Sequence, residues 1–362
     1  MASVHPEVLF YHHGEFSMAG GTLPDAISIT AYRTYGDSKN PAIVFPTCYT
    51  GRLDNFGCIG QDYMIGKNKV LDPSKYYIVT FGLFSNGESS SPSNTPAPYD
   101  GPYFPLVTYE DNIRAQHAVL TKKLGLKKVY AVIGFSMGAQ QAYYWAAMYP
   151  DFIDKFIPLC GTARTPDHSK AMISGLKSVM NNSVDFHGGH YTRQATQGIR
   201  SYCRVFSTWT YSQEFYRKKL YLFGGKYNDV EDFLKGDWEA GYLSAWDAND
   251  LIVLLETWNL GDISKLNIHS TKDSSLRTQN EKVGNGNLEE ALSKIIRPKG
   301  LVMPGSKDLF FTPEDNAEEV SHLKNAKMVV IESDWGHQCG AGLNEADHAF
   351  IKKEVHKFLE EK

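Results

Sequence analysis

The feature that most constrains this chain is a short glycine-bounded turn between an apolar strand and a helix. Residues 129–133, Val-Tyr-Ala-Val-Ile, run directly into Gly134-Phe135-Ser136-Met137-Gly138. Residues 139–149 then follow a helical pattern that Pro150 ends. A G-x-S-x-G sequence in this setting predicts a sharp strand-to-helix turn that presents the serine as a nucleophile, with glycines that let the backbone pack closely. The alternative is a serine that only caps the helix.

The sequence around this turn alternates short apolar runs with helical patterns. Nearly continuous apolar runs are typical of strands buried on both faces of a parallel sheet. We expect strands at 42–45, 76–81, 129–133 and 156–159, and helices at 108–124 and 139–149. The alternation predicts the α/β class, with a doubly wound and mostly parallel sheet.

The middle of the chain changes character, with few β-branched runs and many aromatic residues. Helical patterns occur there, as at 211–222 and 248–258, and they indicate an inserted helical cap. The strand–helix rhythm then returns, with a strand at 300–303, a helix at 313–323, a strand at 328–331 and a helix at 345–359. A chain of 362 residues suits one large core with an insertion. We therefore expect core segments at 1–165 and 294–362, and a cap at 166–293.

A serine nucleophile needs a base and an orienting carboxylate, and both candidates follow strands after the cap. Asp308 follows the strand at 300–303 through a Gly-Ser-Lys turn, and His337 follows the strand at 328–331. In this fold the chain order of the catalytic residues is Ser, acid, His. The sequence predicts Ser136 as nucleophile, His337 as base and Asp308 as acid, with Asp334 and Asp315 as rival acids.

Two backbone N–H groups should bind the oxyanion that forms during acyl transfer. One belongs to Met137, directly after the nucleophile, and the other to the loop that follows an early strand. That loop is Pro-Thr-Cys-Tyr-Thr-Gly at 46–51. The sequence does not choose between Cys48 and Tyr49 as the donor.

Composition and short motifs exclude several other kinds of protein. The net charge is −4 with scattered basic residues, and no stretch is apolar enough to span a membrane, so neither nucleic acid nor membrane is an expected partner. The five cysteines are widely spaced and form no C-x-x-C pair, and no phosphate-binding or dinucleotide motif occurs. We expect no metal, no cofactor and a small-molecule substrate. A cytoplasmic location is expected, and a homodimer is compatible with the sequence.

Several segments together resemble the homoserine O-acetyltransferase family of the α/β-hydrolase superfamily. They are 134–150, Asp-Phe-His-Gly-Gly-His-Tyr at 185–191, Arg204 with Tyr211, Asp-Ala-Asn-Asp at 247–250, and Ser-Asp-Trp-Gly-His at 333–337. The resemblance implies a helical cap over a catalytic triad and an acyl-serine intermediate. It also implies that Arg204 holds a substrate carboxylate and that Tyr211 and the residue after His337 lie at the substrate.

The chain departs from this family at positions that bear on the substrate. The transferases carry an aspartate after the catalytic histidine that holds the substrate amine, and here that residue is Gln338. Phe135 and Ala139 stand where the transferases usually have glycine. We therefore expect a serine hydrolase acting on a small ester or a related acyl substrate. The alternatives are an acyl-CoA-dependent O-acetyltransferase and a non-catalytic ligand binder on the same fold.

Overall fold

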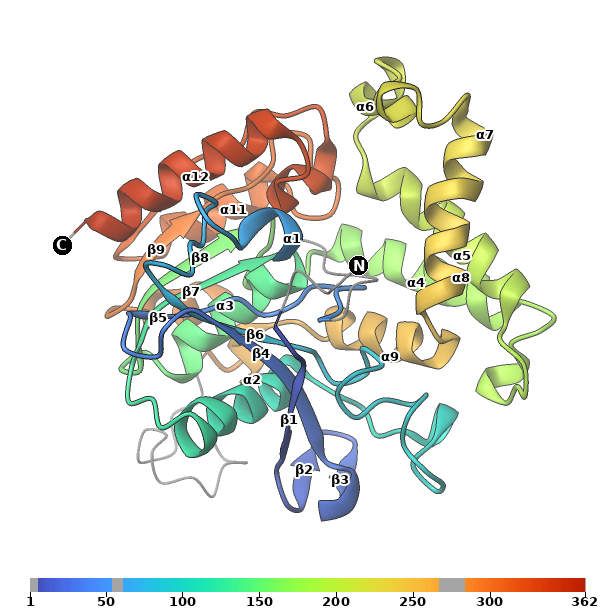
Figure 1. Ribbon diagram of the computed structural model, residues 1–362, viewed down its shortest axis with the longest axis horizontal. Helices are drawn as coiled ribbons and strands as arrows, with labels where there is room; N and C mark the ends of the chain where they lie inside the picture. Colours follow the sequence, from blue (N-terminus) through green and yellow to red (C-terminus); the bar gives the residue numbers. More distant parts are fainter. Residues whose placement is uncertain (1–5, 54–60, 267–283, 362) are drawn as a thin grey trace.

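The computed structural model describes residues 6–53, 61–266 and 284–361, and its central element is an eight-stranded sheet (Figure 1). The strand order is β1-β4-β6-β5-β7-β8-β9-β10. The strands are β1 (Leu9–His12), β4 (Ile29–Tyr35), β6 (Tyr77–Phe81), β5 (Ala42–Val44), β7 (Val129–Phe135), β8 (Ile153–Leu159), β9 (Lys299–Val302) and β10 (Ala326–Met328). All neighbours from β6 to β10 pair in parallel, so the predicted fold class is confirmed.

The amino-terminal strands are antiparallel and were not predicted. β1 pairs with β4, and β4 pairs with β6, both antiparallel. A separate antiparallel hairpin consists of β2 (Phe16–Met18) and β3 (Gly21–Leu23). β1 and β4 extend one edge of the parallel sheet, and the hairpin is not part of it.

The strand order reverses around β5, which lies between β6 and β7. The next strand in the chain, β6, pairs with one edge of β5, and the following strand, β7, pairs with the other edge. The loop after β5 and Ser136 after β7 therefore meet at the carboxyl ends of adjacent parallel strands. Open α/β sheets bind their ligands at such a reversal point.

Apolar side chains cover both faces of the sheet. Ile43 and Val44, adjacent in β5, belong to different buried clusters on opposite faces. Helices α2 (Tyr109–Ala118) and α3 (Met137–Met148) contribute to one cluster, and α12 (Glu345–Glu360) contributes to the other (Figure 1). Burial on both sides explains why the strand sequences are almost entirely apolar.

The helices predicted in the first half of the chain are confirmed. Thr108 caps α2 in a reciprocal capping box with Asp111, and a π-helical turn at Val119–Lys123 continues the helix. α3 begins two residues earlier than predicted, directly after Ser136, and ends before Pro150. A further short helix, α1 (Gln61–Met64), precedes β6.

Helices α4 to α10 lie between β8 and β9 in the chain, and α4 to α9 gather beside the sheet (Figure 1). Their bounds are α4 (Asp167–Asn181), α5 (Thr196–Thr210), α6 (Gln213–Arg217), α7 (Val230–Phe233), α8 (Ala240–Ala245), α9 (Ala248–Asn259) and α10 (Leu288–Ser293). The prediction at 248–258 is confirmed as α9. The prediction of one helix at 211–222 is wrong, because Lys219 adopts φ +55° and a left-handed residue ends the helical path after α6.

The carboxyl-terminal elements follow the predicted order, with one strand displaced. The helices are α11 (Pro313–Ser321) and α12, and the strand between them is β10 at Ala326–Met328 rather than at 328–331. Beyond β10, Ile331 makes only an isolated bridge to Gly305. Pro304 on the neighbouring segment has no N–H to donate, so the ladder is interrupted there.

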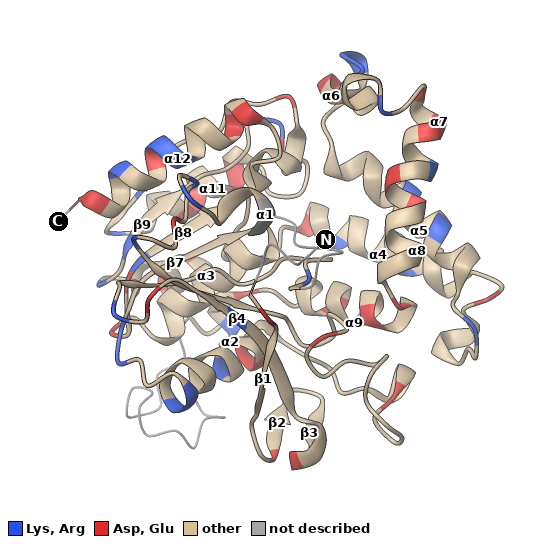
Figure 2. Cartoon of the chain, in the orientation of Figure 1, with Lys and Arg blue, Asp and Glu red and all other residues tan. Residues whose placement is uncertain are grey.

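Charged residues of both signs are interspersed along the helices, α2 and α12 among them (Figure 2). Within the described ranges, no helix combines the length and apolar character that a bilayer crossing requires.

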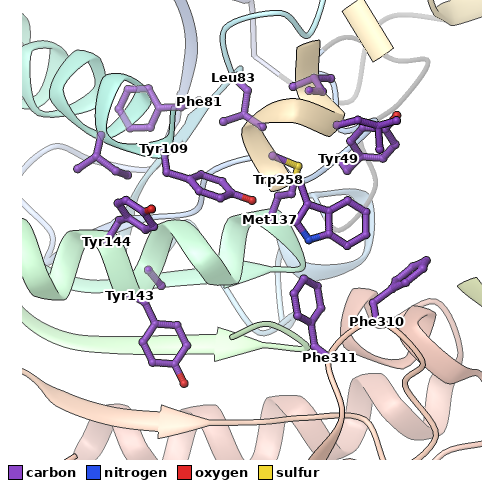
Figure 3. Packing of buried hydrophobic residues seen from close by; sticks show 14 of the residues in the cluster. Tyr49, Phe81, Leu83, Tyr109, Met137, Tyr143, Tyr144, Trp258, Phe310 and Phe311 are labelled. Carbon is purple, nitrogen blue, oxygen red and sulfur yellow. The ribbon is translucent and has the colours of Figure 1, made fainter. Parts of the chain in front are cut away.

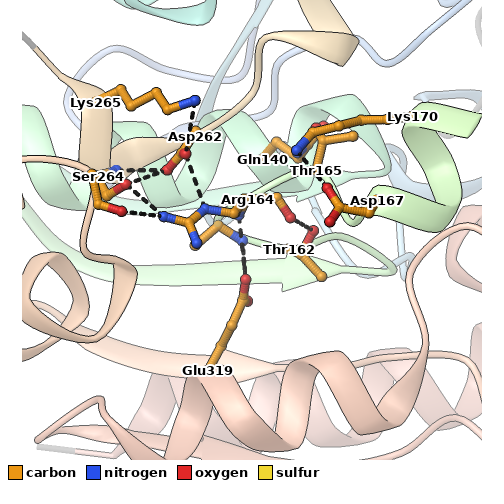
Figure 4. A network of polar contacts seen from close by, with 12 residues as sticks. Gln140, Thr162, Arg164, Thr165, Asp167, Lys170, Asp262, Ser264, Lys265 and Glu319 are labelled. Atoms are coloured by element: carbon orange, nitrogen blue, oxygen red, sulfur yellow. Dashed lines mark hydrogen bonds and ion pairs between the residues drawn. The ribbon is translucent and has the colours of Figure 1, made fainter.

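Polar contacts join the segment before α4 to the segment after α9 (Figure 4). Arg164 and Asp262 form an antiparallel bridge, and the Arg164 Nε lies 2.9 Å from an Asp262 carboxylate oxygen. Glu319 of α11 accepts hydrogen bonds from the N–H groups of Ala163 at 2.8 Å and Arg164 at 3.3 Å. Glu319 is almost fully buried, and this burial raises the pKa of its carboxyl group to about 8.

This raised pKa predicts that stability falls as pH rises. Folded Glu319 stays protonated up to about pH 8, whereas an unfolded glutamate ionises near ~4.3. Between these values the folded state binds more protons, so the free energy of unfolding should fall by at most about 1.4 kcal/mol per pH unit. Urea denaturation of Glu319→Gln from pH 5 to 8 should show a shallower decline than the wild type. Parallel curves for the two proteins would contradict this.

Candidate active site

Ser136 occupies a strained turn that two glycines make sterically accessible. It joins β7 to α3 with φ +58° and ψ −122°, and its side chain is buried. A Cβ atom on Gly134 would lie 2.0 Å from the Gly138 carbonyl oxygen, and one on Gly138 would lie 2.9 Å from the Pro46 carbonyl oxygen. Any larger residue at either position would push the turn apart. The sequence motif is therefore explained by backbone contacts.

His337 connects the serine to a carboxylate. Its Nε2 atom lies 2.7 Å from Ser136 Oγ, and its Nδ1 atom lies 2.7 Å from Asp308 Oδ2. The other oxygen of Asp308 accepts hydrogen bonds from the backbone N–H groups of Phe310 at 2.8 Å and Phe311 at 3.2 Å. These bonds fix the carboxylate, which in turn fixes the imidazole. The structure thus brings together the three residues that the sequence predicts.

The rival acids lie elsewhere. Asp334 is partly exposed and pairs with Lys218 and Lys307, each at 2.5 Å. Hydrogen bonds from Lys218 and Lys307 lower the pKa of the Asp334 carboxyl group. At the start of α11, the Asp315 carboxylate accepts a hydrogen bond from the Thr312 hydroxyl, and the Asp315 N–H donates one to the same hydroxyl. Neither carboxylate contacts His337.

Aromatic side chains enclose the imidazole of His337. The ring centroids of Phe310 and Phe135 lie 4.7 and 4.8 Å from its ring centroid, and that of Phe311 lies 5.8 Å away. Figure 3 shows Phe310 and Phe311 beside Trp258, near Met137 at the start of α3. Apolar walls of this kind exclude water and strengthen the hydrogen bonds inside them.

The candidate oxyanion donors lie on both sides of the serine. Met137 is the first residue of α3, so its N–H group has no acceptor within the helix. Across from it, the Cys48 carbonyl accepts a hydrogen bond from the Gly51 N–H at 2.9 Å, which closes a turn through Tyr49. The Tyr49 hydroxyl bonds the Tyr202 hydroxyl of α5 and, at 3.3 Å, the Leu251 carbonyl of α9. Cys48 and Tyr49 both remain candidate donors.

Arg204, expected to hold a substrate carboxylate, pairs with two carboxylates of the chain itself. Its guanidinium group makes two hydrogen bonds to Glu231 of α7, at 2.8 and 2.9 Å, and bonds Glu239 as well. These bonds, first to Glu231 and then to Glu239, raise the pKa of Arg204 further. About a third of the side chain is exposed (33%). The contact of Arg204 with a substrate carboxylate stays a prediction.

Tyr211 and Gln338 lie on segments next to His337. The Tyr211 ring is buried and stacks on Phe215 with a centroid distance of 3.9 Å. A Cβ atom on Gly336 would lie 2.9 Å from the Tyr211 carbonyl carbon, so the two segments touch. Gln338 is partly exposed in the 3-10 helix Gly336–Ala341. Their contact with a substrate stays a prediction.

One cluster in the described residues has the donor spacing of a metal site. Cys160, Asp308 and His337 each place a ligand atom within 4.8 Å of the others. Asp308 and His337 already bond each other, and burial raises the pKa of the Cys160 thiol, which disfavours the thiolate that metals bind. Cys339 lies with its sulfur 3.6 Å from that of Cys160. The fifth cysteine, Cys58, lies outside the described residues.

Sequence reasoning missed two buried polar residues in the helix that follows Ser136. Gln140 and Gln141 of α3 are fully buried, although the surrounding helix is apolar. Two adjacent amides on an apolar helix were the available signal, because a buried amide needs partners. No comparable signal marked Phe310 and Phe311 as the donors to Asp308.

Comparisons with known proteins agree with this architecture. Residues 41–338 match the model of the alpha/beta hydrolase fold family. The ethyl acetate hydrolase of Pseudomonas veronii is 30% identical over 338 residues, covering 90% of each chain. A homoserine O-acetyltransferase of Haemophilus influenzae is 27% identical over 361 residues, covering 92% of this chain and 94% of that protein.

A solved structure extends the agreement to the whole fold. The acetylester hydrolase of Corynebacterium glutamicum superposes with a TM-score of 0.87 at 28% identity, covering 98% of this chain and 96% of that one. The resemblance to homoserine O-acetyltransferases is confirmed, and ester hydrolases stand beside them among the relatives. The chain is therefore an α/β-hydrolase enzyme and belongs to the alpha/beta hydrolase fold family.

Proposed function

We propose that this protein is a carboxylic ester hydrolase that acts on small esters through an acyl-enzyme on Ser136. One observation carries the proposal: a hydrogen-bonded line runs from the Ser136 hydroxyl through both ring nitrogens of His337 to Asp308. This line lies at the reversal point of the sheet, where such folds bind ligands. The names of the relatives, an ethyl acetate hydrolase and an acetylester hydrolase, support the same chemistry.

In the acylation step, Ser136 Oγ attacks the ester carbonyl carbon while His337 Nε2 takes its proton. Asp308 stabilises the imidazolium that forms. The carbonyl oxygen gains negative charge and accepts hydrogen bonds from Met137 N–H and from the loop at 46–51. The tetrahedral intermediate then expels the alcohol, which receives the proton from His337. A water molecule, deprotonated by His337, then attacks the carbonyl carbon of the acyl-serine, and the carboxylic acid is released.

Hydrolysis is favoured over acetyl transfer to homoserine by the residues that would meet an amino acid. Its ammonium needs a charged partner, because a buried charge with only an amide beside it bears most of its desolvation cost. Gln338 is neutral, and Arg204 is already bound by Glu231 and Glu239. The rings around His337, those of Phe135, Phe310 and Phe311, are also uncharged, which suits a neutral ester. A non-catalytic binder has no need for three aligned catalytic groups.

We also propose that residues 166–293 act as a cap on a core made of 1–165 and 294–362. The Arg164–Asp262 bridge joins the two connections between these parts. The Tyr49–Tyr202 hydroxyl contact and the stacking of Phe206 on Phe310, at 5.4 Å, link cap helix α5 to the loops around Ser136. In this arrangement the cap supplies one wall of the acyl site.

The proposed triad predicts strongly non-additive mutant effects. Ser136→Ala and His337→Ala should each lower kcat for p-nitrophenyl acetate by several orders of magnitude, and the double mutant by little more, because the residues act as one unit. Asp308→Asn should also be severe. Asp334→Asn is the matched control and should stay within about threefold of the wild type, since Asp334 only pairs with surface lysines. An inactive Asp334→Asn beside an active Asp308→Asn would identify the wrong acid.

The choice of acceptor can be tested on the wild type and one variant. We expect measurable hydrolysis of short-chain esters and negligible acetyl transfer from acetyl-CoA to homoserine. Arg204→Ala should leave the rate of hydrolysis within about threefold of the wild type, because the Arg204 charge is already paired with Glu231 and Glu239. Homoserine acetylation with kcat/KM of ~10⁴ M⁻¹s⁻¹ or more would instead make the protein a transferase.

A further inference from the structure

Two adjacent amides lie in the apolar interior of α3, and they have different partners. Gln140 and Gln141 are both fully buried. Gln140 accepts a hydrogen bond from the Tyr109 hydroxyl at 2.7 Å and donates to the Thr165 hydroxyl at 3.0 Å, next to the start of α4. Gln141 points instead toward the loop that follows β5. Neither residue takes part in the reaction proposed above.

A one-way chain of hydrogen bonds fixes the orientation of the Gln141 amide. The indole N–H of Trp145 can only donate, and it bonds Gln116 Oε1 at 3.0 Å. Gln116 Nε2 must then face Gln141 Oε1, at 2.6 Å. This leaves Gln141 Nε2 to donate to two carbonyl oxygens, which can only accept: Thr47 at 2.9 Å and Met137 at 3.1 Å. The Trp145 donor at one end and the carbonyl acceptors at the other therefore fix which group donates in every bond of the chain.

The two carbonyls at the end of this chain belong to the two candidate sides of the oxyanion site. In a trans peptide the N–H points opposite to the preceding C=O, so holding the Thr47 carbonyl sets the direction of the Cys48 N–H. The Thr47 N–H is itself held by the Phe81 carbonyl of β6 at 3.0 Å. Met137 carries the other candidate N–H. Gln141 thus ties the loop at 46–51 to the first turn of α3.

We propose that Gln141 is a positioning residue that holds the two halves of the oxyanion hole at a fixed separation. The proposal rests on the acyl-enzyme function proposed above. Gln141 touches neither the substrate nor Ser136, and it acts through the backbone at Thr47 and Met137. The close approach of Gly138 to the Pro46 carbonyl brings the loop and helix together, and Gln141 fixes how they are aligned.

A transition-state analogue separates this role from general packing. A short-chain alkyl trifluoromethyl ketone forms a hemiketal with Ser136, and its oxygen becomes the anion that the hole binds. Removing one oxyanion donor outright lowers kcat by about 10²–10³-fold. For Gln141→Met, which only misaligns the donors, we expect ketone affinity and kcat to fall together by about ten- to a hundredfold. KM should change by less than about threefold.

Gln140→Met is the matched control, because it removes an equally buried amide from the next position of the same helix. It should lower the melting temperature comparably while ketone affinity and kcat stay within about threefold. Equal losses of ketone affinity in the two variants would overturn the positioning role. A wild type that the ketone does not inhibit would overturn the proposed function instead, so the two failures are distinguishable.

Gln141→Glu keeps the shape of the side chain and the acceptor for Gln116, and it provides the test if Gln141→Met does not fold. A protonated glutamate can donate to one of the two carbonyls, whereas an ionised one repels both. Burial favours the protonated form, so kcat and ketone affinity of this variant should fall as pH rises, relative to the wild type. Identical pH profiles for Gln141→Glu and the wild type would overturn the proposal.

Discussion

The close contact between Gly134 and Gly138 is the constraint on which the site depends. Without side chains at these two positions, the end of β7 and the first turn of α3 approach closely enough to hold Ser136 at a positive φ. Such a conformation costs on the order of 1–3 kcal/mol, and the surrounding sheet and helix must offset it. The turn then aims the hydroxyl toward His337 at the carboxyl end of the sheet.

Next to this turn, His337 and Asp308 each have defined hydrogen-bond partners. The Asp308 carboxylate accepts three hydrogen bonds, and phenylalanine rings surround the imidazole that one of them orients. Preorganised groups of this kind need little rearrangement when charge develops in the transition state. Arg204 is paired with Glu231 and Glu239, and Gln338 is neutral, so neither offers an unpaired charge to an amino-acid acceptor. This difference supports water as the acceptor in the proposed reaction.

The sequence predicted the parts of the site that local patterns encode. Ser136, Asp308 and His337 each follow an apolar strand, and the structure brings them together, while the catalytic role of each stays a prediction. The ion pairs of Arg204 were not predicted because its partners, Glu231 and Glu239, lie 27 and 35 residues further along the chain. The strand expected at 328–331 moved because Pro304 interrupts its partner segment. Contacts between residues far apart in the chain, such as the Gln116–Gln141 hydrogen bond, leave no local sequence pattern from which they could be predicted.

The central claim is that Ser136 is the nucleophile, and active-site labelling tests it most directly. A fluorophosphonate probe loses fluoride as it forms a stable bond to an activated serine oxygen. Peptide mapping of the labelled wild type should place the phosphonyl group on Ser136, with esterase activity lost in proportion to labelling. Full labelling of Ser136 with activity retained, or loss of activity with the label on another residue, would contradict this account.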